Sequence, residues 1–237
     1  MHALDLTLLT LAENLALDEA LLLDAEAGGP EALRFWEWPD LAVVIGAGGK
    51  WAEEANLAAC QNDSVPILRR SSGGGAVLLG PGCLMFSLVL AFDRDPHLTD
   101  LHGSYRWILN RMAEALAPLA PGIAPAGISD LAVAGRKFSG NAQQRKRTHF
   151  LHHGTLLCCF DLTQIPRYLA HPSREPDYRE RRSHLDFVTN LDVPIAKVKA
   201  SLGSAWQALE AMKEWRRVMV NTLCEQKYNC PDWHQRR

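Results

Sequence analysis

Apolar residues recur at helical spacing in three long segments of the chain. Residues 11–27 place a row of leucines on one face and direct Asp18 and Glu19 away from that face. Residues 104–119 repeat apolar side chains every three or four positions, which predicts an amphipathic helix. Residues 195–223 keep the same spacing and predict one long C-terminal helix. Each of these helices can bury one face against a sheet or a neighbouring helix.

Shorter apolar runs between these helices predict β-strands. Residues 33–38 alternate with period two, residues 41–45 are continuously apolar, and Pro39-Asp40 between them is consistent with a hairpin. The other predicted strands cover residues 65–70, 76–79, 83–91, 131–134 and 148–160. Because hairpins outnumber crossover units, the pattern favours an α+β fold, with a mixed β-sheet and flanking helices.

The chain shows no internal repeat, low-complexity linker or domain boundary. We therefore predict a single domain over residues 1–237. Residues 171–183 are polar and rich in charge, which predicts a long loop or lid. Residues 228–237 predict a polar tail that is frayed or loosely docked.

Composition narrows the function by exclusion. A net charge of −2 gives no general attraction to nucleic acid or to an anionic membrane surface. No apolar stretch is long enough to span a bilayer, and the first residues do not resemble a signal peptide. The six cysteines include no C-x-x-C pair, so we expect reduced thiols, a cytoplasmic location and no metal held by protein ligands.

A triple glycine after a predicted strand is the first candidate binding element. Arg70 and Ser72 precede Gly73, Gly74 and Gly75. Backbone N–H groups in such a run can bind an anion, and Arg70 can add a bidentate clamp. The segment lacks the Gly-Lys-Ser/Thr of a P-loop and the G-x-G-x-x-G of dinucleotide-binding folds. A glycine-rich hairpin without any ligand is an equally good interpretation of this segment alone.

A second candidate element contains Lys137. Gly135 and Gly140 flank this lysine and let backbone approach a ligand closely. The apolar run before it is predicted to be a strand that delivers the charged loop into a cleft. By itself the segment is more typical of a surface turn with solvated cations. Its combination with the triple glycine favours a binding site.

His152 and His153 lie within a predicted strand, next to Gly154. Side chains alternate across a strand, so the two imidazoles are expected on opposite faces, where they cannot easily share one metal. A structural or substrate-contacting histidine is the better interpretation. Cys158 and Cys159 follow in the same apolar run and are expected to be buried and inert.

Three blocks of the sequence resemble the signature blocks of lipoate–protein ligases, which share a catalytic fold with octanoyltransferases and biotin ligases. They are residues 69–75, 130–142 and 152–157, in the order and spacing of that family. Residues 14–19 also resemble the family's first helix. The resemblance covers roughly residues 14–160. It implies a mixed sheet that wraps a narrow tunnel for an acyl chain.

The resemblance also implies roles for individual residues. Lys137 corresponds to the catalytic lysine that contacts the acyl carbonyl and the α-phosphate of an acyl-adenylate. A compact ammonium between glycines can stabilise oxygens on which negative charge develops. The positions expected to bind substrate or nucleotide are Arg70, Ser72, Gly73, Gly74, Gly75, Val77, Asp130, Ser139, Gly140, Asn141, Ala142, His153 and Gly154.

The ligase activity implied by the resemblance uses ATP with Mg²⁺ to activate lipoate, octanoate or a related medium-chain acid as acyl-AMP. A lysine of a lipoyl-domain acceptor, on a 2-oxoacid dehydrogenase subunit or a glycine-cleavage H protein, would then take the acyl group. The alternative is an octanoyltransferase, which takes octanoyl from acyl carrier protein through a cysteine thioester. The corresponding cysteine position is near Gly122, and no cysteine lies between Cys83 and Cys158. This favours the ligase, although Cys83 stays open as a nucleophile.

Several positions depart from the family pattern. Leu79 and Gly80 stand where the ligases usually carry histidine and aspartate, and Ser129 replaces an asparagine. No counterpart of the long ligases' C-terminal accessory domain is expected, so a separate accessory chain is a candidate partner. A non-catalytic acyl- or nucleotide-binding relative is a third interpretation, against which the presence of Lys137 argues.

Overall fold

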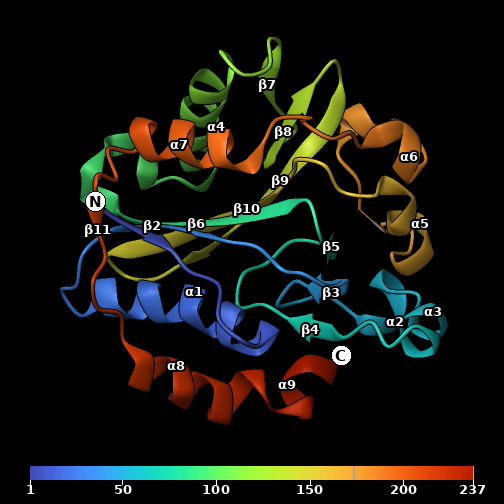
Figure 1. Ribbon diagram of the computed structural model, residues 1–237, viewed down its shortest axis with the longest axis horizontal. Coiled ribbons are helices and arrows are strands. Elements are labelled where there is room, and N and C mark those ends of the chain that lie inside the picture. The colour runs from blue at the N-terminus through green and yellow to red at the C-terminus, as the bar shows by residue number, and fades with distance from the viewer. Residues whose placement is uncertain (173, 237) are drawn as a thin grey trace.

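The computed structural model describes residues 1–172 and 174–236, and a mixed eight-stranded sheet forms its centre (Figure 1). In spatial order the strands are β11 (Glu210–Ala211), β1 (His2–Asp5), β2 (Ala32–Trp36), β6 (Cys83–Ala91), β10 (His149–Leu157), β9 (Arg136–Arg145), β8 (Asp130–Val133) and β7 (Ile123–Ala126). β1 runs parallel to both of its neighbours, and the other neighbouring strands are antiparallel. The predicted α+β fold with a mixed sheet is therefore confirmed.

Helices cover both faces of this sheet. The described helices are α1 (Leu11–Glu26), α2 (Trp51–Glu54), α3 (Leu57–Asn62), α4 (Leu101–Leu116), α5 (Ile165–Tyr168), α6 (His184–Phe187), α7 (Ile195–Ala205), α8 (Arg217–Leu223) and α9 (Pro231–Gln235). α1 lies on one face, with α8 and α9 beyond it, whereas α4 and α7 lie on the other face (Figure 1). Each face buries its own apolar cluster, so the sheet separates two cores.

A second, three-stranded sheet carries two glycine-rich turns, at residues 46–49 and 73–75. Its central strand is β3 (Ala42–Ile45), which is parallel to β4 (Ile67–Arg69) and antiparallel to β5 (Val77–Leu79). The hairpin considered for residues 33–38 and 41–45 is wrong, because β2 pairs with β1 and β6 in the large sheet. The glycine-rich hairpin is also wrong. β4 and β5 flank β3 without pairing, so the triple-glycine loop crosses the end of β3.

Helix α1 is buried on nearly every side. A capping box between Thr10 and Glu13 fixes its first turn. Asp18 and Glu19, predicted to face away from the buried side, are 2% and 6% exposed. The C-terminal segment packs on the outer side of α1, where Tyr228 donates a hydrogen bond to the Glu19 carboxylate at 2.7 Å. Sequence periodicity could not show this second layer.

The long helix predicted over residues 195–223 is wrong. α7 ends at Ala205, and Trp206 at its C-terminus is 1% exposed. The chain then returns to the sheet edge, where β11 pairs with β1. A separate helix, α8, begins only at Arg217. Apolar residues beyond Trp206 keep helical spacing, but pairing with β1 and packing on α1 decide their conformation.

The tail predicted to be frayed or loosely docked over residues 228–237 is firmly docked through residue 236. Tyr228 is 1% exposed and His234 is 9% exposed. α9 contacts β4 of the small sheet. Within this tail, His234 and Trp233 form hydrogen bonds with the buried Arg69 of the small sheet.

The predicted loop over residues 171–183 is confirmed for its described part, and residue 173 lies outside the described residues. Its regular structure is one short 3₁₀ turn at Asp177–Arg179. Among residues 1–172 and 174–236, no helix is long and apolar enough to cross a membrane.

Candidate active site

Lys137 lies in strand β9, not in a loop as predicted from the sequence. The turn before it contains Gly135, whose φ of +72° favours glycine. β8 and β9 shift register next to Lys137, because Leu131 pairs with Ser139 whereas the next residue of β8 pairs with Lys137. This β-bulge leaves Phe138 as the extra residue. It turns the Lys137 side chain toward the same face of β9 as Gly140.

The absence of a side chain at Gly140 leaves the space that the Lys137 ammonium occupies. A Cβ on Gly140 would lie 2.8 Å from both Cε and Nζ of Lys137. Such a distance is shorter than real Cβ contacts allow, so any side chain at position 140 would displace the ammonium. From the sequence, this glycine was expected to let the backbone approach a ligand closely. The structure shows that it is space for a side chain.

Asp130 and Tyr178 hold the ammonium from the other side. Lys137 Nζ lies 2.8 Å from Asp130 Oδ1, and the Tyr178 hydroxyl donates to Asp130 Oδ2 at 2.7 Å. Burial, together with the adjacent carboxylate, raises the pKa of Tyr178, so the phenol stays a donor. Asp130 is 4% exposed, whereas the Lys137 side chain keeps 29% of its surface accessible. The site therefore holds a partly accessible cation in a fixed position.

Substituting Gly140 by alanine is expected to separate Lys137 from Asp130 without unfolding the protein. The new Cβ meets only the flexible end of the lysine, which can swing away. A displacement of about 1 Å at a reacting group can cost about a hundredfold in rate. We expect a loss of this order in kcat for any reaction that Lys137 assists, with an unchanged melting temperature. Gly203→Ala, on helix α7 with open space around the Cβ position, is the matched control. Equal kinetics for the two variants would contradict the role given to Gly140.

Substituting Tyr178 by phenylalanine is expected to lower kcat/KM about tenfold, since a hydrogen bond to a charged group contributes about 1.5–3 kcal/mol. The ring contact of Tyr178 with Phe187, at 5.1 Å between centroids, would persist while Asp130 loses a donor. Tyr168→Phe is the control, because its hydroxyl donates to Asp63 in a different part of the structure. If the two variants had the same kcat/KM, Tyr178 would not hold Asp130 for function.

Arg70 organises the triple-glycine loop from within. Its guanidinium donates to the backbone oxygens of Gly73 at 2.5 Å and Gly75 at 2.9 Å, and Nε donates to Ser72 Oγ at 3.0 Å. Burial lowers the pKa of Arg70 to about 10, so it stays charged at neutral pH. The sequence predicted a clamp on a ligand. In the structure these donors hold the loop's own oxygens and place a buried positive charge beneath exposed glycines.

The triple-glycine loop lies against a second glycine turn and against β9. A Cβ on Gly46 would lie 1.9 Å from the carbonyl oxygen of Gly74, which itself has a φ of +86°. On the other side, Ala142 Cβ lies 3.8 Å from the Cβ position of Gly74. Ala142 and Gly140 share one face of β9, about 7 Å apart along the strand. The loop and Lys137 therefore open onto the same face of the sheet.

Ser139 and Asn141 lie on the opposite face of β9 and are separated from Lys137. Asn141 Nδ2 donates to the Ser129 carbonyl at 2.7 Å. Asn141 Oδ1 lies 2.1 Å from the Cβ position of Gly154, so only glycine fits there. These residues fix the pairing of β8, β9 and β10. Their separation from Lys137 was not predicted, because this segment was interpreted as a loop and not as a strand.

Packing explains why Leu79 and Gly80 depart from the family pattern, and it also places Val77, which was expected to bind substrate. Val77 is partly buried against the first core, and Leu79 is 2% exposed within it. A Cβ on Gly80 would lie 2.8 Å from side-chain atoms of both Leu41 and Phe160. Leu79 thus fills apolar space in the core, and the side chains of Leu41 and Phe160 leave no room for a side chain at Gly80.

His152 and His153 lie on opposite faces of the sheet, as predicted. Burial lowers the pKa of His152 to about 3, and its ring packs against Tyr105 at 5.4 Å between centroids. His153 faces α1, with Nε2 at 2.5 Å from Ser72 Oγ and Nδ1 at 3.1 Å from Asp18 Oδ2. His153 therefore links the glycine loop to the first helix.

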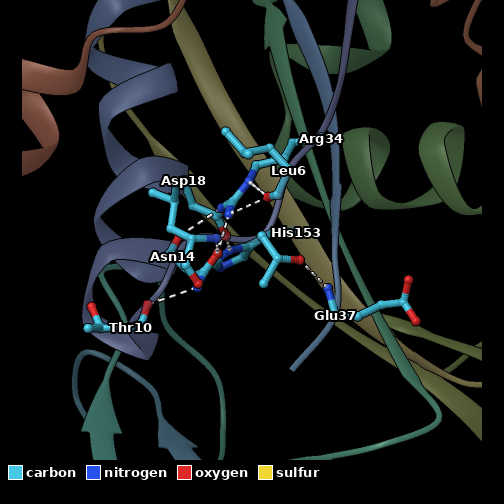
Figure 2. Close-up of polar contacts among 9 residues, drawn as sticks. Leu6, Thr10, Asn14, Asp18, Arg34, Glu37 and His153 are labelled. Carbon is cyan, nitrogen blue, oxygen red and sulfur yellow. Dashed lines mark hydrogen bonds and ion pairs between the residues drawn. The ribbon is translucent and has the colours of Figure 1, made fainter. Parts of the chain in front are cut away.

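A buried cluster beneath the loop was missed by the sequence analysis. Arg34 of β2, which is 0% exposed, donates to Asp18 Oδ1 at 2.6 Å and to Asn14 Oδ1 at 2.6 Å (Figure 2). Asn14 and Asp18 are one helical turn apart, so both reach the same guanidinium. Their i, i+4 spacing was the available signal, but the partner on another strand could not be foreseen.

The C-terminal segment supports the glycine turn at residues 46–49 through Arg69. The buried guanidinium donates to the oxygens of Gly46 at 2.9 Å and Gly49 at 2.7 Å, and also to His234 O at 2.9 Å. Trp233 Nε1 returns a hydrogen bond to Arg69 O. Burial lowers the pKa of His234, whose neutral ring accepts from the Arg69 N–H at 2.9 Å.

Cys83, the cysteine considered as a nucleophile, is buried, and so is Cys158, whereas the expectation that Cys159 is buried is wrong, because it is exposed. Cys83 is 1% exposed and Cys158 is fully buried, and burial raises the pKa of each to about 12. Thiols of this kind carry almost no thiolate at neutral pH. Within the described part of the chain, no group of three or more His, Cys, Asp or Glu side chains is arranged to hold a metal ion.

The large sheet, the small sheet and their glycine turns have the architecture of a catalytic domain of the lipoyl-ligase type. The fold is similar to that of a bi-partite lipoate protein ligase from Thermoplasma acidophilum, with a TM-score of 0.84 and 25% identity over 99% of this chain and 95% of that one. The family profile of the lipoyl protein ligase A/B catalytic domain matches residues 10–208. The chain belongs to this family.

Curated relatives carry two different names. A probable lipoate-protein ligase A of Mycoplasma pneumoniae is 31% identical over 66% of this chain, and the chain spans only 45% of that relative's length. The octanoyltransferase LipM of Carboxydothermus hydrogenoformans is 28% identical over 94% of this chain and 93% of its own length. The family is thus established, and relatives within it are named for two different reactions.

Proposed function

We propose that this protein attaches lipoate, or a related medium-chain acid, to a lysine of a lipoyl-domain acceptor protein, using ATP and Mg²⁺ to form an acyl-AMP intermediate. The observation that carries the proposal is the Lys137 ammonium, held by Asp130 over Gly140 and facing the same side as the triple-glycine loop. A fixed cation stabilises negative charge on both an acyl carbonyl and a phosphate.

The glycine loop fits an anionic head group. Gly73, Gly74 and Gly75 are exposed, and a Cβ on Gly73 would meet no atom within 4 Å. ATP would supply activation of the carboxylate. The chain's own contribution is binding and charge stabilisation: the exposed loop amides, with Arg70 beneath them, bind the anion, and Lys137 stabilises the carbonyl oxygen during attack by the acceptor amine.

Octanoyl transfer from acyl carrier protein is the second candidate, favoured by the 93% coverage of the LipM relative. A thioester route needs a nucleophilic cysteine. Cys83, the candidate from the sequence, is buried and has a raised pKa. The cysteine chemistry therefore supports the ligase over the transferase.

A two-arm assay tests the proposal. Purified protein is incubated with a lipoyl domain and either lipoate, ATP and Mg²⁺ or octanoyl-carrier protein, and the acceptor mass is measured. We expect modification in the first arm only, dependent on ATP. Product solely from the carrier protein, without ATP, would replace the ligase by the transferase. Each arm is run with and without an accessory chain of the kind that the bi-partite Thermoplasma enzyme suggests.

A further inference from the structure

One row of residues crosses four strands directly beneath helix α1. Arg34 of β2 pairs with Ser87 of β6, Ser87 pairs with His153 of β10, and His153 pairs with Ala142 of β9. Residues directly opposite one another on neighbouring strands point to the same face. Asp18 lies over this row from α1 and contacts both Arg34 and His153.

The charge state of Asp18 follows from these contacts. Burial by itself raises the pKa of Asp18, but the positive charge of Arg34 and the hydrogen bond to His153 lower it below its ordinary value. Asn14 and the Leu6 carbonyl hold the remaining donors of Arg34, which fixes the guanidinium in place (Figure 2). Asp18 is therefore a carboxylate, and both of its oxygens can only accept hydrogen bonds.

An accepting Asp18 sets the direction of every bond that follows. His153 Nδ1 must carry a proton to donate to Asp18 Oδ2. In the neutral ring Nε2 then accepts from the Ser72 hydroxyl at 2.5 Å. Ser72 Oγ in turn accepts from Arg70 Nε at 3.0 Å. Each donor in this chain has one acceptor, and Ser72 is the residue that enters the triple-glycine loop.

Ser72 is 1% exposed, so its hydroxyl faces the interior and not a ligand. Its backbone oxygen accepts from Ala47 N at 2.7 Å, which ties the loop to the second glycine turn. Three glycines follow with little conformational restraint of their own. The orientation of the loop amides therefore depends on how firmly Ser72 is held.

We propose that Asp18 and His153 are positioning residues for the triple-glycine loop: Asp18 selects the Nδ1–H tautomer of His153, and that tautomer fixes the Ser72 hydroxyl. The inference rests on the proposed function only in what the loop binds. Relays of this kind around a binding group typically affect affinity or activity about 10- to 100-fold.

Asp18→Asn tests the direction of the bonds with almost no change in shape. The asparagine oxygen can serve Arg34 or His153, but not both. Because the guanidinium cannot act as an acceptor, the oxygen is retained by Arg34 and the amide NH₂ faces His153 Nδ1. The imidazole must then carry its proton on Nε2, and Ser72 receives two donors while its own O–H loses its acceptor.

Two readouts separate this role from simple structural support. ¹⁵N NMR of the histidine rings, with the His153 signals identified by their loss in His153→Gln, is expected to show Nδ1–H in the wild type and Nε2–H in Asp18→Asn. Kinetics are expected to show KM for the acid and ATP raised about tenfold or more, with kcat changed much less. Asp24→Asn is the matched control, because it makes the same substitution on the same helix at a carboxylate whose partner is Arg216. It should keep the Nδ1–H tautomer and the wild-type KM.

His153→Gln supplies a second test if Asp18→Asn folds poorly. The glutamine oxygen can still accept from Ser72, but the link to Asp18 is lost. The effects of Asp18→Asn and His153→Gln on KM should then be non-additive. An unchanged tautomer in Asp18→Asn, additive effects, or an acyl ester trapped on Ser72 and seen by mass spectrometry would each overturn the proposal. Absence of acyl transfer by the wild type would overturn the proposed function alone, since the tautomer is measured on the protein without substrate.

Discussion

Substituting Lys137 by alanine is expected to reduce acyl transfer to the acceptor about a thousandfold, the upper range for removing one group that stabilises a developing oxyanion. Its ammonium is the cation that Asp130 holds over Gly140 on the face shared with the triple-glycine loop. The fold should remain, because the Lys137 side chain is 29% exposed and Asp130 keeps its bond from Tyr178. Acceptor labelling is followed by mass spectrometry and folding by thermal melting.

Lys146→Ala is the control for the loss of a lysine from the same hairpin. Lys146 follows β9 directly, is exposed, and lies far along the strand from Gly140. Its removal should leave both labelling and stability unchanged. Undiminished labelling by the Lys137→Ala protein would exclude Lys137 from the chemistry, and a common loss in both variants would point to net charge instead.

Substituting Gly46 by alanine is expected to have the largest effect on the glycine turns. Its Cβ would lie 1.9 Å from the backbone oxygen of Gly74, and backbone cannot move aside as a flexible side chain can. Overpacking of this kind typically destabilises a protein by about 1–3 kcal/mol. We expect a lower melting temperature together with loss of most activity, because the loop that would bind the anionic head group is pushed out of place.

Gly73→Ala is the paired control for stability. Nothing lies within 4 Å of its Cβ position, and it adds the same methyl group to the neighbouring loop. Its melting temperature should match that of the wild type. If Gly46→Ala melted like Gly73→Ala, the close approach of the two glycine turns would not exist in solution.

Local patterns predicted most of the helices and strands, because the spacing of apolar residues along the sequence shows which face of a helix or strand is buried. The same patterns misplaced residues 195–223, where apolar spacing continues across the end of α7, β11 and α8. Helical spacing alone cannot distinguish one long helix from segments that pack on different surfaces. The hairpin assigned around Pro39-Asp40 was wrong for a similar reason, since β2 and β3 take their partners from distant parts of the chain.

The candidate site likewise contains residues that the sequence predicted and residues that it did not. Lys137, Asp130 and the triple glycine were identified from short motifs, and strand alternation correctly placed His152 and His153 on opposite faces. Tyr178, Asp18 and Arg34 were missed. Tyr178 contacts Asp130 and Asp18 contacts His153, both of which were predicted, and Arg34 contacts Asp18. Their roles depend on partners 16 to 135 positions away, which no local spacing encodes.

The sequence by itself therefore determined the α+β class, the family to which its motifs point and the charged residues of the candidate site. Tertiary structure decided how those residues are used. The bulge at Phe138 brings Lys137 onto the face of Gly140. The register of β2, β6 and β10 aligns Arg34 with His153. The docked C-terminal segment binds Arg69. Each of these depends on long-range strand pairing or packing, where the position of a side chain is set by elements far away in the sequence.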